Sequence, residues 1–323
     1  MIEEYIKENW RSVNRKRDIP DRLNIIKLSG QETSEACMNL LLFENNDAHP
    51  SYFVKVNRRP VDLSRLKEEF SALERAGQLL GGDYKGTIPK AVFLGSIDDF
   101  TMILVEEYIH GRFVLLHKYN DLKIFLAKAM DWIKNFYLVT RKEGSVLPWS
   151  IFKNEFTKSV AGMELDHGLR RKLDRIVNAV ERRRPKDLPL SSLQGDFSFN
   201  NILIQNDGRV CVTDWEDYCD NALPFLDIEF LLFHAGLFCG AKIDHIENFN
   251  HFFKRDSLTF ELVNHHLEDY CFLLGIDKSL FYLASVKDTV DVMRNGYGRH
   301  KRIPMQRMEF LETLANLALR EID

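Results

Sequence analysis

The stretch LQGDFSFNNILIQNDGRVCVTDWED (Leu193–Asp217) decides how this chain is interpreted, because polar residues flank two apolar runs joined by a turn. The runs are ILIQ, residues 202–205, and RVCVT, residues 209–213, and the triplet Asn206–Gly208 lies between them. An Asn-Asp-Gly triplet favours the left-handed backbone conformations of a tight turn. The pattern therefore predicts an antiparallel β-hairpin.

Polar side chains stand at the outer ends of this predicted hairpin. Asn201 comes just before the first strand and Asp214 just after the second, and the two ends of a hairpin lie side by side. An amide oxygen and a carboxylate brought together in this way form a hard-oxygen half-site suited to Mg²⁺. Asp196, on the loop that enters the hairpin, could then accept a proton. Phosphoryl transfer needs this division of labour, with a base for the attacking hydroxyl and a metal that neutralises the charge of the nucleotide.

A simpler interpretation exists for each of these residues alone. Asp196 and Asn201 are typical turn formers, and Asp214 is a typical helix cap. The occurrence of all three around one hairpin favours a shared site instead.

The same stretch resembles the catalytic segment of aminoglycoside phosphotransferases and choline-kinase-like small-molecule kinases. In that family His-Gly-Asp is followed by Asn, a hairpin and Asp-Trp. This chain has QGD at 194–196, then Asn201, then DW at 214–215. The family often continues with Pro and Asp at the start of a helix, which Pro224 and Asp227 match.

The resemblance implies a role for each matching residue. Asp196 would be the catalytic carboxylate that orients and deprotonates the acceptor hydroxyl, and Asn201 and Asp214 would hold Mg²⁺. Gln194 replaces the usual His, which we expect to change the support of the loop without removing the chemistry. The implied fold is α+β, a two-lobed protein-kinase-like fold with a small antiparallel-sheet N-lobe and a mainly helical C-lobe.

Hydrophobic periodicity independently predicts two regions. Up to about Glu107 the chain mixes β-like runs with one strong helix, Leu63–Leu80, whereas helical patterns dominate afterwards. We therefore expect a nucleotide-binding lobe at residues 1–106 and a helical lobe with the catalytic loop and acceptor pocket at residues 107–323. The predicted strands are Leu23–Leu28, Met38–Phe43, Ser51–Val56, Lys90–Leu94 and Thr101–Val105. The predicted later helices are Asp121–Arg141, Leu169–Arg183, Pro224–Phe238, Ser257–Leu274, Lys278–Arg294 and Met305–Leu319.

A kinase also needs a cation on the nucleotide phosphates and an acid that holds the cation. The strand SYFVKV places Lys55 among alternating apolar residues, and the following helix offers Glu68, Glu69 and Glu74. By itself a lysine in such a strand is more often an edge-strand charge that faces water. The resemblance selects Glu69 as the partner, so that the ion pair would hold Lys55 toward the α and β phosphates.

The loop Ser29–Glu35 (SGQETSE) would cover the phosphates. It contains a single glycine, Gly30, so an ordinary polar hairpin is an equally good interpretation. Backbone amides of the loop, helped by the Ser29 hydroxyl, would then bind phosphate oxygens.

The segment Met102–Arg112 (MILVEEYIHGR) resembles the linker between the lobes of the family. Backbone groups near Glu107 and Ile109 would bind the edge of adenine. Without the resemblance, the segment indicates only a strand followed by a turn.

Composition excludes several other classes of protein. The 323 residues contain 44 basic and 48 acidic side chains, and the net charge of −4 offers no overall positive field for nucleic acid or an anionic membrane. The five cysteines have no CxxC spacing, and neither a leader nor a transmembrane run is visible, so we expect a cytoplasmic protein. The sequence does not predict an oligomeric state.

The sequence leaves the acceptor open. Acidic residues such as Glu216 and Glu229 would attract a cationic aminoglycoside or amino alcohol, and Trp215 and Phe225 would form an aromatic wall or simply pack in the core. A basic cluster at residues 294–302 would instead suit an acidic sugar. Two alternatives to an ATP-dependent O-phosphotransferase are a nucleotide-binding pseudokinase or scaffold, suggested by Gln194, and a helical interaction protein that binds no nucleotide.

Overall fold

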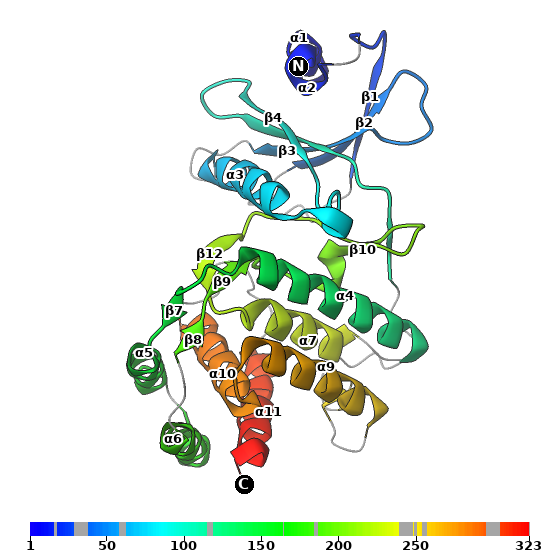
Figure 1. The fold of residues 1–323 in the computed structure, drawn as a ribbon. Coiled ribbons are helices and arrows are strands. Elements are labelled where there is room, and N and C mark those ends of the chain that lie inside the picture. The colour runs from blue at the N-terminus through cyan, green and yellow to red at the C-terminus, as the bar shows by residue number, and fades with distance from the viewer. Residues whose placement is uncertain are drawn as a thin grey trace. The chain divides into compact units, whose positions relative to one another are not determined.

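The computed structural model describes most of the chain in two compact units. The described residues are 1–15, 18–28, 38–57, 63–114, 119–163, 165–183, 187–238, 248, 251–253, 257–294 and 304–322. The first unit comprises residues 1–113 and 201–218, and the second comprises residues 114–200 and 219–323 (Figure 1). The predicted hairpin thus packs with the N-terminal part of the chain. Our functional division at residue 107 stays a prediction.

A five-stranded antiparallel sheet forms the centre of the first unit, in the order β1-β2-β3-β5-β4. The five predicted strands are confirmed to within two residues at each end. Their bounds are Leu23–Lys27 for β1, Met38–Glu44 for β2, Tyr52–Asn57 for β3, Ala91–Ser96 for β4 and Met102–Glu107 for β5.

Both faces of this sheet are covered, because residues alternate between the two sides of a strand. On one side Val54 and Val56 join a core with Ile6 of α1 (Ile2–Glu8) and Trp10 of α2 (Trp10–Val13), two helices that we did not predict. On the other side Leu66 of α3 packs on Met102 and Leu104 of β5. The helix α3 spans Leu63–Leu79, as predicted (Figure 1).

The predicted hairpin is confirmed. Strands β10 (Ile202–Ile204) and β11 (Val210–Val212) pair antiparallel around a turn in which Gly208 has φ +85°. The short strand β6 (Arg112–Phe113) adds a third strand beside β10. The apolar side chains of β10 and β11 are buried.

Helices make up most of the second unit. They are α4 (Tyr119–Thr140), α5 (Trp149–Ala161), α6 (His167–Arg182), α7 (Leu226–Phe238), α9 (Leu258–Leu274), α10 (Lys278–Arg294) and α11 (Pro304–Ile322). We predicted all of these except α5. Two small sheets accompany them, pairing β7 (Val146–Leu147) with β8 (Leu188–Pro189) and β9 (Ser191–Leu193) with β12 (Cys219–Ala222).

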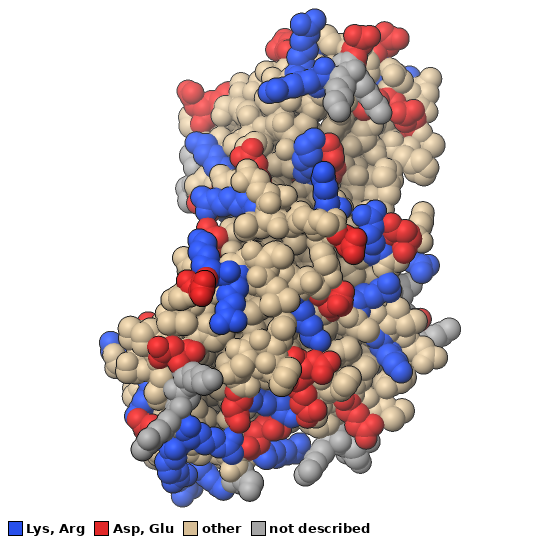
Figure 2. Space-filling model, viewed as in Figure 1, with Lys and Arg blue, Asp and Glu red and all other residues tan. Residues whose placement is uncertain are grey.

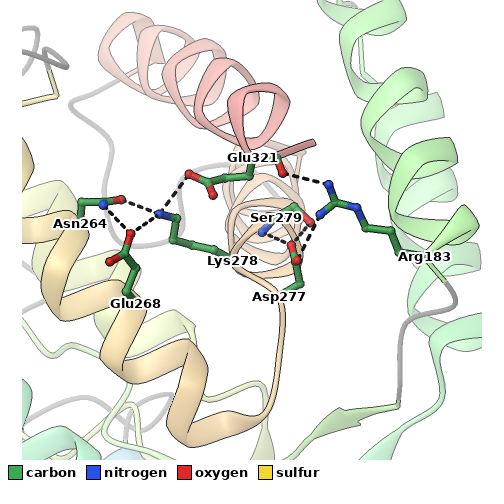
Figure 3. A network of polar contacts seen from close by, with 7 residues as sticks. All are labelled: Arg183, Asn264, Glu268, Asp277, Lys278, Ser279 and Glu321. Carbon is green, nitrogen blue, oxygen red and sulfur yellow. Dashed lines mark hydrogen bonds and ion pairs between the residues drawn. The ribbon is translucent and has the colours of Figure 1, made fainter. Parts of the chain in front are cut away.

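Polar contacts join the start of α10 to three other helices of this unit (Figure 3). Asp277 accepts hydrogen bonds from Ser279 N at 2.8 Å and from Arg183 Nη1 at 3.1 Å. Lys278 Nζ lies 3.0 Å from Glu268 and 3.1 Å from Glu321. These contacts hold α10 against the ends of α6 and α11 and against the side of α9.

Lys and Arg side chains are interspersed with Asp and Glu over the face drawn in Figure 2. Among the described residues, no helix combines the length and the hydropathy needed to cross a bilayer.

Candidate active site

Lys55 is the centre of a buried polar cluster in the first unit. It lies on the central strand β3, is only 6% exposed, and occupies the face of the sheet that α3 covers. Its Nζ lies 2.5 Å from Glu69 Oε1 and 2.7 Å from Asp214 Oδ1. The predicted pair with Glu69 is therefore present, while Glu68 is exposed. The edge-strand interpretation of Lys55 is wrong, because two strands flank β3.

The acids around Lys55 keep it charged. Burial alone would lower the pKa of the ammonium, but the carboxylates of Glu69 and Asp214 outweigh burial and raise that pKa well above its usual value. A protonated lysine fixed in a low-dielectric region interacts strongly with any anion that reaches it. Contact with phosphates stays a prediction.

The segment after β11 is tied to α3 at two points. Trp215 N donates to Glu69 Oε1 at 3.1 Å, and Arg65 Nη2 donates to Glu216 Oε1 at 2.5 Å. These contacts hold Asp214 at φ +61°, a conformation that residues other than glycine rarely adopt. Such strain is typical of functional sites.

Sequence reasoning missed the Arg65–Glu216 pair. A signal was present, because Arg65 stands one helical turn before Glu69 and therefore on the same face of α3. The proximity of Glu216 to that face depends on the turn at Asp214, which the sequence does not predict.

The predicted magnesium ligands lie at the same end of the hairpin. Thr213 N donates to Asn201 O at 2.9 Å, which brings the backbone of Asn201 beside the residue that precedes Asp214. One carboxylate oxygen from each of Glu69, Asp214 and Glu216 lies within 4.8 Å of the other two. Oxygen donors of this kind fit Mg²⁺. Binding of the metal by Asn201 and Asp214 stays a prediction.

The loop of Asp196, in the second unit, is held by two buried side chains. Gln194, which is fully buried, accepts a hydrogen bond from Asp196 N through Oε1 at 2.9 Å. Asp227, in the first turn of α7, accepts from Gln194 N at 2.9 Å and from Gly195 N at 2.8 Å. The glutamine thus supports the backbone of the loop. The catalytic role of Asp196 stays a prediction.

Asp227 is an unusual acid because it is 1% exposed. Burial raises its pKa to about 6, although the two backbone hydrogen bonds pull the pKa down. At neutral pH the group is mainly a carboxylate, so its bonds to the loop are charge-assisted.

The other predicted nucleotide contacts are only partly described. Ser29 and Gly30 lie outside the described residues. Glu107 is the last residue of β5, and its backbone amide donates a hydrogen bond to Lys90 O at 2.9 Å. The backbone group of Glu107 that could bind a nucleobase is therefore its carbonyl. Ile109 is half-buried in the segment that follows. Contact of Glu107 and Ile109 with adenine stays a prediction.

Glu106 is a second buried acid that sequence reasoning missed. It is 2% exposed, and its Oε1 has no hydrogen-bond partner among the described residues. Burial raises its pKa to about 8, against the opposing charge of Lys55. A signal was present, because an acid directly after four apolar residues (MILV) of a central strand is expected to be buried.

Two residues considered for an acceptor pocket belong to the core instead. Trp215 and Phe225 are fully buried, which confirms core packing for both rings. Glu229 is 5% exposed and accepts a hydrogen bond from Thr289 at 2.9 Å, so it is not a surface charge. Most of the basic cluster, residues 295–302, lies outside the described residues.

Comparison with known proteins identifies the fold. No family model and no curated protein matches the chain. A thermostable mutant of aminoglycoside phosphotransferase APH(4)-Ia, solved in a ternary complex with ADP and hygromycin B, is similar over 99% of this chain and 98% of its own, with a TM-score of 0.54 and 12% identity. The chain has the protein-kinase-like fold of the aminoglycoside phosphotransferases. Our prediction of an α+β two-lobed fold is confirmed.

Two further structures share this fold and differ in their nucleotides. Amicoumacin kinase hAmiN, in complex with AMP-PNP, Ca²⁺ and Ami, has a TM-score of 0.53 at 13% identity and is similar over 99% of this chain and 94% of its own. A mutant of aminoglycoside 2'-phosphotransferase-IIIa in complex with GDP has a TM-score of 0.53 at 13% identity, over 99% of this chain and 97% of its own. The fold therefore accommodates adenine and guanine nucleotides.

Proposed function

We propose that this chain is an ATP-dependent O-phosphotransferase that moves the γ-phosphoryl group of ATP to a hydroxyl of a small molecule. One observation carries the proposal: Lys55 Nζ contacts both Glu69 and Asp214. This arrangement joins a phosphate-binding cation, the acid that orients it and a metal-binding carboxylate within one compact unit. The shared fold with aminoglycoside phosphotransferases supports the same reaction class.

The proposed nucleotide site uses residues of the first unit. Lys55 neutralises the α and β phosphates, and Glu69 holds its ammonium in place. Asn201 and Asp214 hold Mg²⁺, which would neutralise charge on the β and γ phosphates. We assign phosphate contacts to the loop with Ser29 and Gly30.

The nucleobase would lie against the segment after β5. We assign its contacts to the Glu107 carbonyl and to the backbone of Ile109. These two assignments rest on the resemblance of the linker and on the position of the linker at the end of β5.

Asp196 is the proposed catalytic carboxylate. It would accept the proton of the acceptor hydroxyl as the oxygen attacks the γ-phosphorus. Two observations support this assignment, the hydrogen bond from Asp196 N to Gln194 and the anchoring of Gly195 by Asp227. Both restrain the loop, and a base is effective only when it is held in position.

The proposed acceptor is an aminoglycoside, an amino alcohol or a sugar-like molecule. Structures that share the fold support this class, since they include complexes with hygromycin B and Ami. The unbridged thiols of Cys211, Cys219 and Cys271 support our assignment to the reducing cytoplasm.

An ADP-release assay with Mg·ATP tests the proposal across aminoglycosides, choline, ethanolamine, sugars, nucleosides and hydroxy amino acids. We expect one class to release ADP well above the rate without acceptor. Asp196→Asn should retain Mg·ATP binding and lower turnover by roughly two to four orders of magnitude. Full turnover by this variant would remove Asp196 from catalysis.

The same experiment separates the alternatives. A pseudokinase binds Mg·ATP, detected as thermal stabilisation, and releases no ADP with any acceptor. A helical interaction protein shows neither response. Lys153→Met is a surface control, because Lys153 pairs with Glu181 on the exposed surface of the second unit. This variant should leave thermal stabilisation by Mg·ATP and ADP release unchanged.

A further inference from the structure

The buried carboxyl group of Glu106 is unfavourable for the free energy of the protein without a ligand. The residue is 2% exposed, and its Oε1 lacks a hydrogen-bond partner among the described residues. Burying a carboxyl oxygen without a partner is unfavourable whether the group is neutral or charged. Groups of this kind, with a strongly shifted pKa, are candidates for a functional site. The raised pKa of about 8 for Glu106 agrees with this view.

The position of Glu106 points to one part of a nucleotide. In the register of β3 and β5, Lys55 pairs with Leu104 and Phe53 pairs with Glu106. Paired residues project to the same side of a sheet, so Glu106 lies on the same face as Lys55, two residues beyond Leu104, which pairs with Lys55. From Leu104 to Glu106 the strand runs toward Glu107, which we assign to the base, and away from Lys55, which we assign to the phosphates. The carboxyl of Glu106 is therefore placed for the base end of the nucleotide.

We propose that Glu106 selects adenine over guanine nucleotides by accepting a hydrogen bond from the exocyclic 6-amino group of the base. This inference rests on the proposed nucleotide site. The adenine 6-amino group is a donor with two hydrogens, and guanine has a 6-oxo acceptor in its place. The Glu107 carbonyl is another acceptor at this end of the site, since the Glu107 amide is engaged by Lys90 O. These two acceptors would each receive a hydrogen from the 6-amino group of adenine and would repel the 6-oxo group of guanine.

The charged groups around Glu106 set the conditions of the test. Lys55 faces it from β3, Glu69 from α3 and Asp214 from the segment after β11. The neutral acid can also donate to a 6-oxo group, whereas the carboxylate only accepts. Binding is therefore compared at pH 9, above the pKa of Glu106 in the free protein.

The test measures dissociation constants of ATP, GTP and the triphosphate of purine riboside, which lacks the 6-amino group, by displacement of a fluorescent nucleotide with Mg²⁺ present. The wild type should bind ATP at least about tenfold more tightly than either other nucleotide. In Glu106→Met, which fills a similar volume without an acceptor, the preference for ATP over the other two nucleotides should fall by at least about threefold, and the Glu107 carbonyl should retain the rest. In Glu106→Gln the GTP constant should fall, because the amide can turn its NH₂ group toward the 6-oxo group.

Purine riboside triphosphate keeps the experiment decisive. Replacing Glu106 should weaken the binding of ATP and leave the binding of purine riboside triphosphate nearly unchanged, because only ATP carries the donor that the Glu106 carboxyl accepts. Glu68→Gln, at the exposed neighbour of Glu69, is the control and should leave all three constants unchanged. Thermal unfolding confirms that the Glu106 variants are folded.

The outcomes separate this inference from the proposed function. A wild type that binds ATP and GTP in a ratio that Glu106→Met leaves unchanged overturns the role of Glu106 alone. A wild type that binds no nucleotide overturns the proposed function, and the role of Glu106 with it.

Discussion

Two lysines of this protein illustrate how burial decides what an ion pair does. Lys55 in the first unit and Lys278 in the second each contact two carboxylates. The side chain of Glu69, one partner of Lys55, is 1% exposed, whereas that of Glu268, one partner of Lys278, is 56% exposed. Water can replace Lys278 as a partner of Glu268 but cannot reach Glu69. We infer that the first cluster is built for a ligand and the second holds helices together.

Removing Lys55 should have the largest effect. Lys55→Met leaves the fully buried Glu69 without its cation, so the free energy of unfolding should fall by about 3–5 kcal/mol. Mg·ATP binding should also be lost. Chemical denaturation and a nucleotide displacement assay measure the two effects, and the double variant Lys55→Met/Glu69→Leu should recover much of the stability but none of the binding. Unchanged stability in the single variant would contradict a buried charge pair.

Asp227, a buried acid of the second unit, should show that the loss of stability depends on burial and not on which unit carries the residue. Asp227→Asn replaces one of the two acceptor oxygens that hold Gln194 N and Gly195 N with a donor. The free energy of unfolding should fall by about 1–3 kcal/mol. Turnover should fall further than Mg·ATP affinity, because the loop carries Asp196. A variant that weakens nucleotide binding and leaves turnover unchanged would contradict this role.

Glu106 should make the stability of the first unit depend on pH. Its pKa rises from the ordinary value of 4.5 in the unfolded chain to about 8 in the fold, so the folded state holds the proton more tightly. This stabilisation is complete below pH 4.5 and is lost as the pH rises toward 8. Glu106→Gln should remove the loss, so the variant should gain roughly 4 kcal/mol relative to the wild type between pH 5 and pH 9. Denaturation curves at several pH values measure the difference, and parallel curves would show that Glu106 ionises normally.

Lys278 should give the smallest effect. Lys278→Met should lower the free energy of unfolding by about 0–1 kcal/mol, because Glu268 is 56% exposed and Glu321 is 32% exposed, so both carboxylates stay hydrated without the lysine. The difference should shrink further in 1 M salt, where screening is strong. A loss as large as that of Lys55→Met would show that exposure of the partners does not separate the two clusters.

Local patterns in the sequence were sufficient for the strands, most of the helices and the hairpin. The triplet Asn206–Gly208 specifies its turn through the conformational preferences of three adjacent residues. Leu66, Phe70 and Leu73 mark one face of α3 by their spacing alone. The pair of Lys55 and Glu69 was also predicted, but only through the resemblance of their surroundings to a known family.

One missed contact depends on distant segments. Arg65 and Glu216 are 151 residues apart in the chain, and their contact requires the strained turn at Asp214. No local pattern carries that information.

The sequence by itself determined most of the helices, the strands of the large sheet, the hairpin and the order of the polar residues, because turn chemistry and hydrophobic periodicity act over a few residues. Only the tertiary structure decided which of these residues lost water. Lys55, Glu69 and Glu106 are buried because α3 packs on one face of the sheet and the segment after β11 contacts Lys55 and Glu69 there. Burial then sets the pKa of each group and the energy of each ion pair, and it leaves Glu106 Oε1 without a hydrogen-bond partner in the part of the chain that the structure describes.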